Sequence, residues 1–262
     1  MHSNPVIDVI LNRKSVRVYE PRPISEEAQQ MILAAALRAP TAGNMMLYSI
    51  IEVTDQAAKD TLAETCDHQP FIAKAPLVLL FLADYQRWFD YFMWSGVEGL
   101  CQQTGEALRK PEEGDLLLAC CDALIAAHTA VIAAESLGIG SCYIGDIMEN
   151  YEVHRGLFAL PPYALPICLV CFGYPTEQQK QRPMTTRFGT QFIVFKDRYR
   201  RLAGGDLAQM FADQEGQLAT WKEKPEGIRN FGQFMYLRKF SADFSKEMSR
   251  SVRAMLQTWT QG

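Results

Sequence analysis

The sequence lacks the common motifs by which enzymes hold a metal, a nucleotide phosphate or a nucleophile. Its 262 residues contain no GxxxxGK[ST] phosphate loop and no GxSxG nucleophile elbow. Histidine occurs only four times, and no pair has the HExxH spacing or another metal-ligand spacing. We therefore expect no metal site and no catalytic side chain, so that the chemistry of an enzyme with this sequence comes from a bound cofactor.

Charge and cysteine content exclude further classes. The net charge of −4 is unusual for a general nucleic-acid binder, so we expect no nucleic-acid partner. The seven cysteines are odd in number and scattered, which predicts reduced thiols in a cytoplasmic protein. Cys168 and Cys171 have CxxC spacing within an apolar run, 165–172, that is typical of a buried strand. Residues i and i+3 of a strand face opposite sides, so we interpret both as core cysteines.

Long uninterrupted hydrophobic runs are also absent. Polar residues such as Asn4 and Asp8 break up the first residues, so we expect no signal peptide. The only long apolar segment is 116–137, and it carries Asp122 and His128. We interpret it as a buried helix and expect no membrane association.

Hydrophobic periodicity predicts helices interleaved with strands, as in an α/β or α+β protein with one sheet flanked by helices. Expected helices cover residues 6–11, 25–37, 56–66, 116–137 and 151–157, and expected strands cover 49–53, 77–82, 139–144 and 165–172. Residues 94–113 are less regular, and we expect an insertion or lid at about 88–114. We divide the chain into a core, 1–195, and a helical C-terminal extension, 196–262, packing on the core or on a partner subunit.

The extension itself is predicted to contain two helices. They cover 206–221 and 241–259 and are joined by a Lys-Pro-Glu-Gly linker at 224–227 and an aromatic stretch at 231–240.

Basic side chains near the start of the chain predict an anion site. If the segment is extended, Arg13, Ser15 and Arg17 point to one face because strand side chains alternate. Two guanidinium forks and a hydroxyl form a good receptor for a phosphate monoester. Lys180 and Arg182 have the same i, i+2 spacing, and folding would allow both pairs to reach one phosphate. The alternative interpretation is two solvated charge patches.

Four blocks of sequence carry a resemblance. They are ILNRKSVR at 10–17 (followed by PISE at 23–26), APTAGN at 39–44, the segment 132–145 with its glycines, and LPICLVCFGYP at 165–175. In order and spacing they resemble the FMN-dependent nitroreductase superfamily, in particular the oxygen-insensitive NAD(P)H nitroreductase and flavin reductase branch. The resemblance implies an α+β, three-layer α-β-α fold with a central, mostly antiparallel sheet and a helical C-terminal extension.

The resemblance also implies FMN as bound cofactor and NADPH or NADH as electron donor. The implied cofactor contacts are Arg13, Lys14, Ser15, Arg17, Thr41, Ala42, Gly43, Asn44, Gln69, Tyr143, Ile144, Gly145, Lys180 and Arg182. The residues of the two basic pairs, with Ser15, would hold the phosphate and ribityl end, and Lys14 would lie beside the pyrimidine edge. Residues 41–44 would line the ring or the neighbouring subunit's site.

The remaining implied contacts surround the ring. Gln69 would contact the ribityl or pyrimidine part, and Tyr143, Ile144 and Gly145 would cover the ring near N5. The alternatives are an ordinary loop residue at 69 and strand core at 143–144, whereas Gly145 fits a loop that approaches a flat ring too closely for a Cβ. The sequence departs from the branch at Asp146, where relatives often have a second glycine. A carboxylate there would alter the flavin potential or the choice of substrate.

By resemblance, the activity is that of an FMN-dependent NAD(P)H oxidoreductase. Hydride would pass through flavin N5 to small electron-poor acceptors (nitroaromatics, quinones or free flavin) in a ping-pong scheme, with Arg238 or Lys239 binding the nicotinamide cofactor. The family implies an intertwined homodimer with FMN at the subunit interface. Alternatives are a flavin-binding storage or sensing protein, or another flavin reaction such as dehalogenation or enone reduction.

Overall fold

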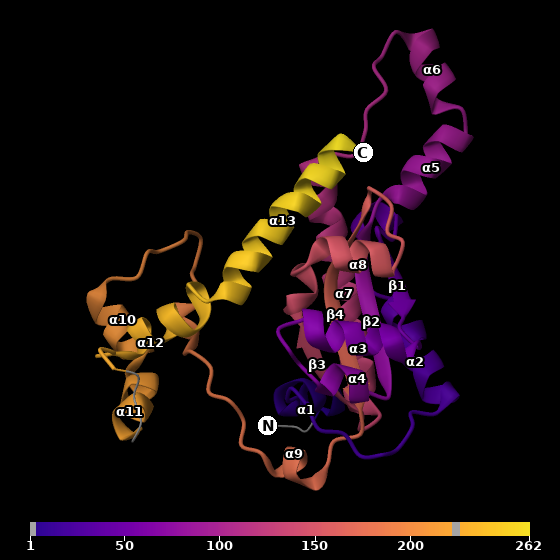
Figure 1. Ribbon diagram of the computed structural model, residues 1–262. Coiled ribbons are helices and arrows are strands. Elements are labelled where there is room, and N and C mark those ends of the chain that lie inside the picture. The colour runs from indigo at the N-terminus through magenta and orange to yellow at the C-terminus, as the bar shows by residue number, and fades with distance from the viewer. Residues whose placement is uncertain (1–3, 222–225) are drawn as a thin grey trace. The chain divides into compact units, whose positions relative to one another are not determined.

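The core of the protein is an antiparallel sheet (Figure 1). The computed structural model describes residues 4–221 and 226–262. Within them four strands pair in the order β1-β2-β4-β3: β1 (Tyr48–Glu52), β2 (Leu77–Asp84), β3 (Gly140–Ile144) and β4 (Ala164–Gly173). The central strands β2 and β4 are almost entirely buried because both of their faces are covered, and they are apolar except for Asp84 at the end of β2.

Helices cover both faces of this sheet. Successive side chains of β2 face opposite sides. Leu79 and Phe81 pack with residues of α2 (Glu26–Leu37) and α7 (Glu113–Ser136). Val78 and Leu80 pack with residues of α3 (Gln56–Thr65) and α4 (Phe71–Lys74). The three-layer α-β-α arrangement predicted from the sequence is confirmed.

The CxxC pair of β4 follows the same alternation. Cys168 lies in the cluster under α7, and Cys171 lies in the cluster under α3. All seven cysteines are free. The two sulfurs therefore face opposite sides of the sheet, as predicted, and burial raises the pKa of both thiols.

Helix α7 has the length and composition of a membrane span, but it serves as the central helix of one layer. Of its most apolar window, 44% is buried inside the protein. The buried side is a stripe of alanines from Ala119 to Ala134, whose small side chains let the helix approach the sheet closely. We interpret α7 as the core helix of this fold.

The remaining helices are labelled in Figure 1. They are α1 (Pro5–Asn12), α5 (Gln86–Trp94), α6 (Val97–Thr104), α8 (Tyr151–Leu157), α9 (Glu177–Gln181), α10 (Gly204–Met210), α11 (Ala212–Thr220), α12 (Phe231–Met235) and α13 (Asp243–Gln261). Most predicted elements are found within a few residues of their expected bounds, and α8 begins and ends where predicted. Ser25 caps α2 by accepting a hydrogen bond from the Ala28 amide, as its sequence indicates.

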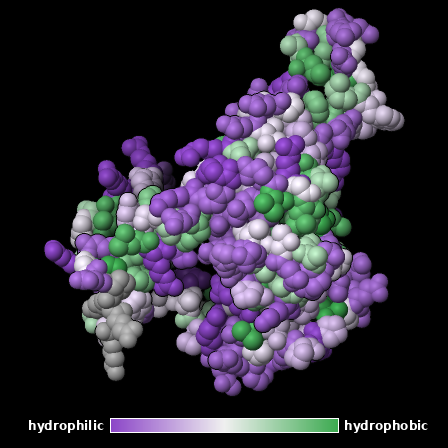
Figure 2. All heavy atoms as spheres, viewed as in Figure 1, coloured by the Kyte–Doolittle hydropathy of each residue, from purple (hydrophilic) through white to green (hydrophobic). Residues whose placement is uncertain are grey.

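The segment 94–113 is more regular than predicted, because α6 occupies part of it. Gly96 and Gly105 have φ of 80° and 77° and flank this helix. The glycines therefore end helices here, since a left-handed residue at a helix end favours glycine. Together α5 and α6 form an arm that projects away from the sheet (Figure 1), and Trp94 and Leu100 on it are exposed. Figure 2 shows hydrophobic residues on the surface of this arm.

The chain forms two compact units. The first comprises the residues up to Arg182 and from Glu247 onward, and the second comprises Pro183–Lys246. Within the second unit, the helix predicted over 206–221 is interrupted at Phe211, whose ring packs against those of Phe188 and Phe231. The first half of the predicted 224–227 linker lies outside the described residues.

The end of the chain belongs to the first unit. Trp259 of α13 is completely buried, and its ring meets that of Tyr163 edge-on at 5.6 Å between centroids. Its indole Nε1 donates to the Glu112 carbonyl at 3.0 Å. The last turns of α13 are therefore part of the core.

Gly140 tests how tightly the N-terminal segment packs on β3. A Cβ at Gly140 would lie 2.5 Å from Cγ2 of the buried Val16. We expect Gly140→Ala to lower the free energy of unfolding by about 1–3 kcal/mol through overpacking. Urea unfolding would measure this. The double variant with Val16→Ala should lose less than the two single changes added together, and strict additivity would contradict the contact.

Candidate functional site

The predicted anion-binding segment lies along the edge of the sheet. Ser15 forms a parallel bridge with Ser141 of β3, and the Val16 amide donates to the Ser141 carbonyl at 2.8 Å. The segment is therefore extended, as predicted. Arg13, Ser15 and Arg17 occupy alternate positions of this segment, which runs beside β3, and alternate residues of an extended segment share a face.

Three guanidinium groups from the two predicted pairs surround one position of β3. Burial raises the pKa of the Cys142 thiol, while the positive charges of Arg17, Arg13 and Arg182 act in the opposite direction. Arg182 also donates to the Ser15 carbonyl. The structure thus brings Arg182 to Arg13 and Arg17 from far along the sequence, and like charges gathered in this way favour an anion between them.

Arg13 supplies the clearest sign of a missing partner. Its Nη1 is buried and has no hydrogen-bond acceptor among the residues that the structure describes. Glu135 at the end of α7 faces it and accepts a hydrogen bond from the Ser141 hydroxyl at 3.3 Å. Burial raises the pKa of Glu135 to about 7, although the Arg13 charge opposes this. An unsatisfied buried donor costs about 1–3 kcal/mol, so a phosphate oxygen fits this position.

The two lysines of the predicted site already have partners within the chain. Lys14 Nζ donates to the carbonyls of Lys180 and Arg182, both at 2.6 Å, and so fixes the segment that carries Arg182. Lys180 Nζ pairs with Glu177 at 2.6 Å and lies 3.6 Å from Glu20. Both pairs of Lys180 are exposed, and exposed ion pairs are weak, so this ammonium can change partners at little cost.

The far end of β3 carries the ring contacts implied by the resemblance. Ile144 is buried, Tyr143 is half-buried and Gly145 is exposed. A Cβ at Gly145 would meet nothing within 4 Å, so no other part of the described chain requires a glycine there. Gln69 reaches this end, because its Nε2 donates to Oδ2 of Asp146 at 2.7 Å.

Arg17 reaches α4, the helix that begins two residues after Gln69. Its guanidinium is 5.9 Å from the centroid of the Phe71 ring.

Residues 41–44 lie elsewhere in the first unit. They form a tight turn in which Gly43 and Asn44 both have φ of 57°. The Thr41 hydroxyl accepts from the Met46 amide at 2.8 Å, and Asp122 of α7 accepts from the Thr41 hydroxyl and, at 2.9 Å, from the Ala42 amide. No hydrogen bond in the described chain joins this turn to the segment 13–17.

Asp122 is a structural residue that sequence reasoning missed. It is 2% exposed and also accepts from the Leu47 amide at 3.1 Å. A single carboxylate within an apolar helix was the available signal in the sequence. A buried carboxylate requires several hydrogen-bond donors, so Asp122 could have been predicted to bind other parts of the chain.

Arg238 and Lys239, the predicted nicotinamide contacts, belong to the second unit. Both are exposed in a π-helical turn, Tyr236–Phe240. The Arg238 guanidinium lies 5.4 Å from the Phe234 ring centroid, and Lys239 Nζ lies 4.8 Å from that of Phe244. Their positive charges are thus held against aromatic rings.

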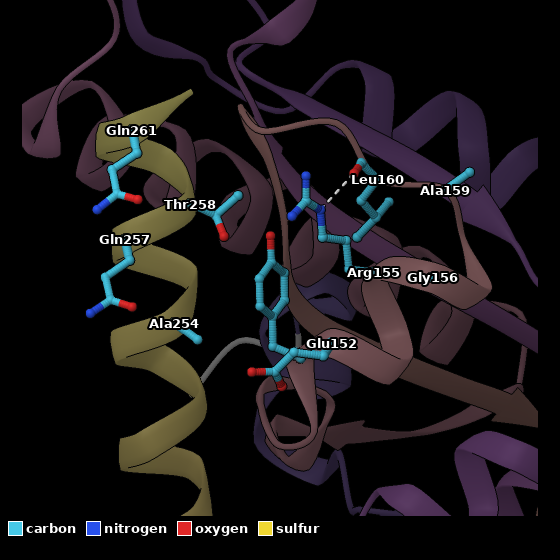
Figure 3. Close-up of a pocket in the computed structure, with 10 residues that line it drawn as sticks. Glu152, Arg155, Gly156, Ala159, Leu160, Ala254, Gln257, Thr258 and Gln261 are labelled. Carbon is cyan, nitrogen blue, oxygen red and sulfur yellow. Dashed lines mark hydrogen bonds between the residues drawn. The ribbon is translucent and has the colours of Figure 1, made fainter.

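A groove of about 500 Å³ between α8 and α13 contains none of the predicted residues (Figure 3). Arg155 donates from Nε to the Leu160 carbonyl at 3.2 Å, and Glu152 is paired with Arg250 at 2.8 Å. Since the charged groups already have partners, we assign this groove no role in cofactor binding.

Comparison with known proteins decides the family. The model of the Nitroreductase family matches residues 10–174. The chain belongs to this family. The oxygen-insensitive NADPH nitroreductase of Salmonella typhimurium is 28% identical over 218 residues, covering 83% of this chain and 82% of that protein. The FMN reductase [NAD(P)H] of Bacillus subtilis is 32% identical over 180 residues, covering 69% of this chain and 70% of that protein.

A solved structure agrees with this assignment. NfrA2 of B. megaterium superposes with a TM-score of 0.77 at 26% identity, covering 98% of each chain. The family and the fold class predicted from the sequence are therefore confirmed.

Proposed function

We propose that this nitroreductase-family protein is an FMN-dependent NAD(P)H oxidoreductase that reduces small electron-poor acceptors such as nitroaromatics, quinones or free flavin. The names of its relatives support the general class, since they include an NADPH nitroreductase and an FMN reductase. The observation that carries the proposal is the arginine cluster on β3, in which a buried Arg13 donor lacks an acceptor within the described chain. The dianionic phosphate of FMN supplies that acceptor.

In this proposal the protein binds and orients the cofactor. The phosphate end is held by Arg13, Ser15, Arg17 and Arg182. Lys180 gives up its ion pairs with Glu177 and Glu20 and binds the phosphate as well. Lys14 fixes the segment 180–182 from behind and lies beside the pyrimidine edge.

Gln69, Tyr143, Ile144 and Gly145 face the ring, where the open position at Gly145 leaves room for it. When bound, FMN takes a hydride from the nicotinamide donor and passes two electrons to the acceptor, in a ping-pong order. The protein contributes no catalytic side chain of its own.

We further propose a homodimer with FMN at the subunit interface. Helix α1 exposes Val6, Ile7, Ile10 and Leu11, and α7, which contacts α1, exposes Leu117, Leu118, Leu124 and Ile125. Exposed apolar side chains on two helices that contact each other are typical of an interface. The turn at 41–44, held away from the arginines of its own chain, then serves the partner's site.

Three further roles belong to the same proposal. The arm formed by α5 and α6, which overlaps the predicted segment 88–114, serves as a lid, since its exposed Trp94 offers an aromatic surface. The extension, 196–262, packs over the core or the partner and brings Arg238 or Lys239 to the nicotinamide cofactor's phosphate. Free cysteines throughout favour the cytoplasm.

Anaerobic reduction tests the activity. We expect the purified protein to show flavin absorption that bleaches on addition of NADPH or NADH. Double-reciprocal plots of the steady-state rate against acceptor concentration, at several fixed donor concentrations, should be parallel, as a ping-pong order requires. Replacing Arg238 and Lys239 by alanine should slow bleaching by NADPH more than by NADH. Flavin bands that persist with both donors would favour the storage interpretation, and a protein that stays colourless after reconstitution with FMN would contradict the proposal.

Arg17→Ala tests the phosphate site. Losing one charge-assisted contact of about 1.5–3 kcal/mol should weaken FMN binding roughly 10- to 100-fold, measured by flavin fluorescence during titration of the apoprotein. The matched control is Arg22→Ala, because Arg22 stacks on Tyr174 at 3.9 Å and lies outside the cluster. Unchanged affinity in Arg17→Ala would refute the assignment.

Leu124→Glu tests the proposed interface. A charge in an apolar interface should convert the dimer into monomers, which analytical ultracentrifugation distinguishes from twice the 29.6 kDa chain mass. Val153→Glu, on the exposed side of α8, serves as control. A wild-type protein that sediments as a monomer at assay concentration would rule the dimer out.

A further inference from the structure

A carboxyl pair lies at the end of β3, where the sequence departs from its branch. Asp146 and Glu149 belong to one tight 3-10 turn, in which the Glu149 amide donates to the Asp146 carbonyl at 2.9 Å. Residues three apart in such a turn lie on the same side, and the nearby Asp146 carboxyl contributes to raising the pKa of Glu149. Two neighbouring carboxyl groups can share a hydrogen bond only when one of them carries a proton.

The surroundings favour keeping that proton. Glu149 is only 4% exposed, and its Oε1 has no partner within the described residues. The other groups that face it are acidic: Asp67 after α3 and Glu247 of α13. The nearby Arg250 is paired with Glu247 and Glu152, both at 2.8 Å.

Burial and the Asp146 charge together raise the pKa of Glu149 to about 8. The Cys66 thiol responds to the same environment, because burial first and then the Asp146 and Glu149 charges raise its pKa. Glu149 therefore favours its protonated form at neutral pH, beside the Asp146 carboxyl.

Gln69 connects this pair to the cofactor surface. Its Nε2 donates to the Cys66 carbonyl at 2.9 Å and to Asp146 Oδ2 at 2.7 Å. The Cys66 carbonyl can only accept, so the amide nitrogen must occupy this position and both of its hydrogens are used. Gln69 consequently has only its carbonyl oxygen left to offer a ligand.

We propose that Asp146 and Glu149 share one proton and orient Gln69, so that Gln69 presents a hydrogen-bond acceptor to the flavin while the charge beside it depends on pH. This inference rests on the proposed function. Asp146 and Glu149 act here as positioning residues. Loss of the shared proton places a second negative charge near the ring, which opposes the negative charge that reduced flavin carries near N1 and O2.

The protein without flavin provides the first test. A carboxyl group whose pKa is higher in the folded than in the unfolded protein stabilises the fold least at high pH, because the native state binds the extra proton. The free energy of unfolding should therefore fall as pH rises from about 4.5 to about 8. Over this range the unfolding equilibrium constant should rise by up to tenfold per pH unit.

Glu149→Gln should remove the part of the pH dependence of stability that Glu149 causes. Other groups, such as Glu135, titrate in both wild type and variant, so the difference between their free energies of unfolding across pH 5–9 reports Glu149 alone. Glu98→Gln, an exposed glutamate on α6, is the matched control and should follow the wild type. If Glu149→Gln is too unstable to measure, Asp146→Asn replaces it, because loss of the Asp146 charge should lower the pH at which Glu149 titrates. Parallel pH curves for wild type and variant would overturn the proposal.

The second test uses the FMN-bound protein and reads the midpoint potential of the flavin against pH. The potential of the wild type should fall more steeply between pH 6 and 9 than that of Glu149→Gln. Identical slopes, with the stability difference present, would overturn the link to the flavin. A wild type that binds no FMN would contradict the proposed function instead, and the stability curves would then decide the carboxyl pair alone.

Discussion

The pairing of residues 13–17 with β3 is the constraint on which the rest of the site depends. β3 lies at the edge of the sheet, with β4 on one side only, so its other side presents unpaired backbone groups. The Val16 amide fills one of them at 2.8 Å. That bond fixes which side chains of the segment face outward, and it places Arg13 and Arg17 on either side of a single β3 position. Without a Cβ at Gly140 the buried Val16 can lie this close.

Much of the fold was predictable because its signals are local. The apolar run at 165–172 became β4, and the Ser25 cap became the start of α2. Glycines mark the ends of α6 in the segment that looked irregular, where the same residues equally fit a loop. The strand order β1-β2-β4-β3 has no such local signal, because it is set by contacts between strands far apart in the sequence.

In the candidate site, too, the features with a local signal were predictable from the sequence, and the contacts between distant segments were not. The spacing of Arg13, Ser15 and Arg17 predicted a common face, and the segment pairs with β3 at Ser15, as an extended segment would. The contacts of Lys14 with the carbonyls of Lys180 and Arg182 span more than 160 residues and leave no pattern in the sequence. Asp122 is comparable, since it anchors a turn about 80 residues away. Such polar contacts depend on how two finished elements meet, which hydrophobic periodicity does not encode.

The charges along β3 then give the site a direction. Arg13, Arg17 and Arg182 act on Cys142 in the middle of β3, whereas Asp146 and Glu149 lie in the turn that follows the strand, so the first group is basic and the second acidic. A dianionic phosphate is attracted to the first end and repelled from the second, so a cofactor with one charged end has only one favourable orientation along the strand. In the proposed complex the uncharged ring would then lie beside Gln69 and the carboxyl pair. The proposed pH-dependent group would therefore act on the redox-active part of the ligand and not on its phosphate anchor.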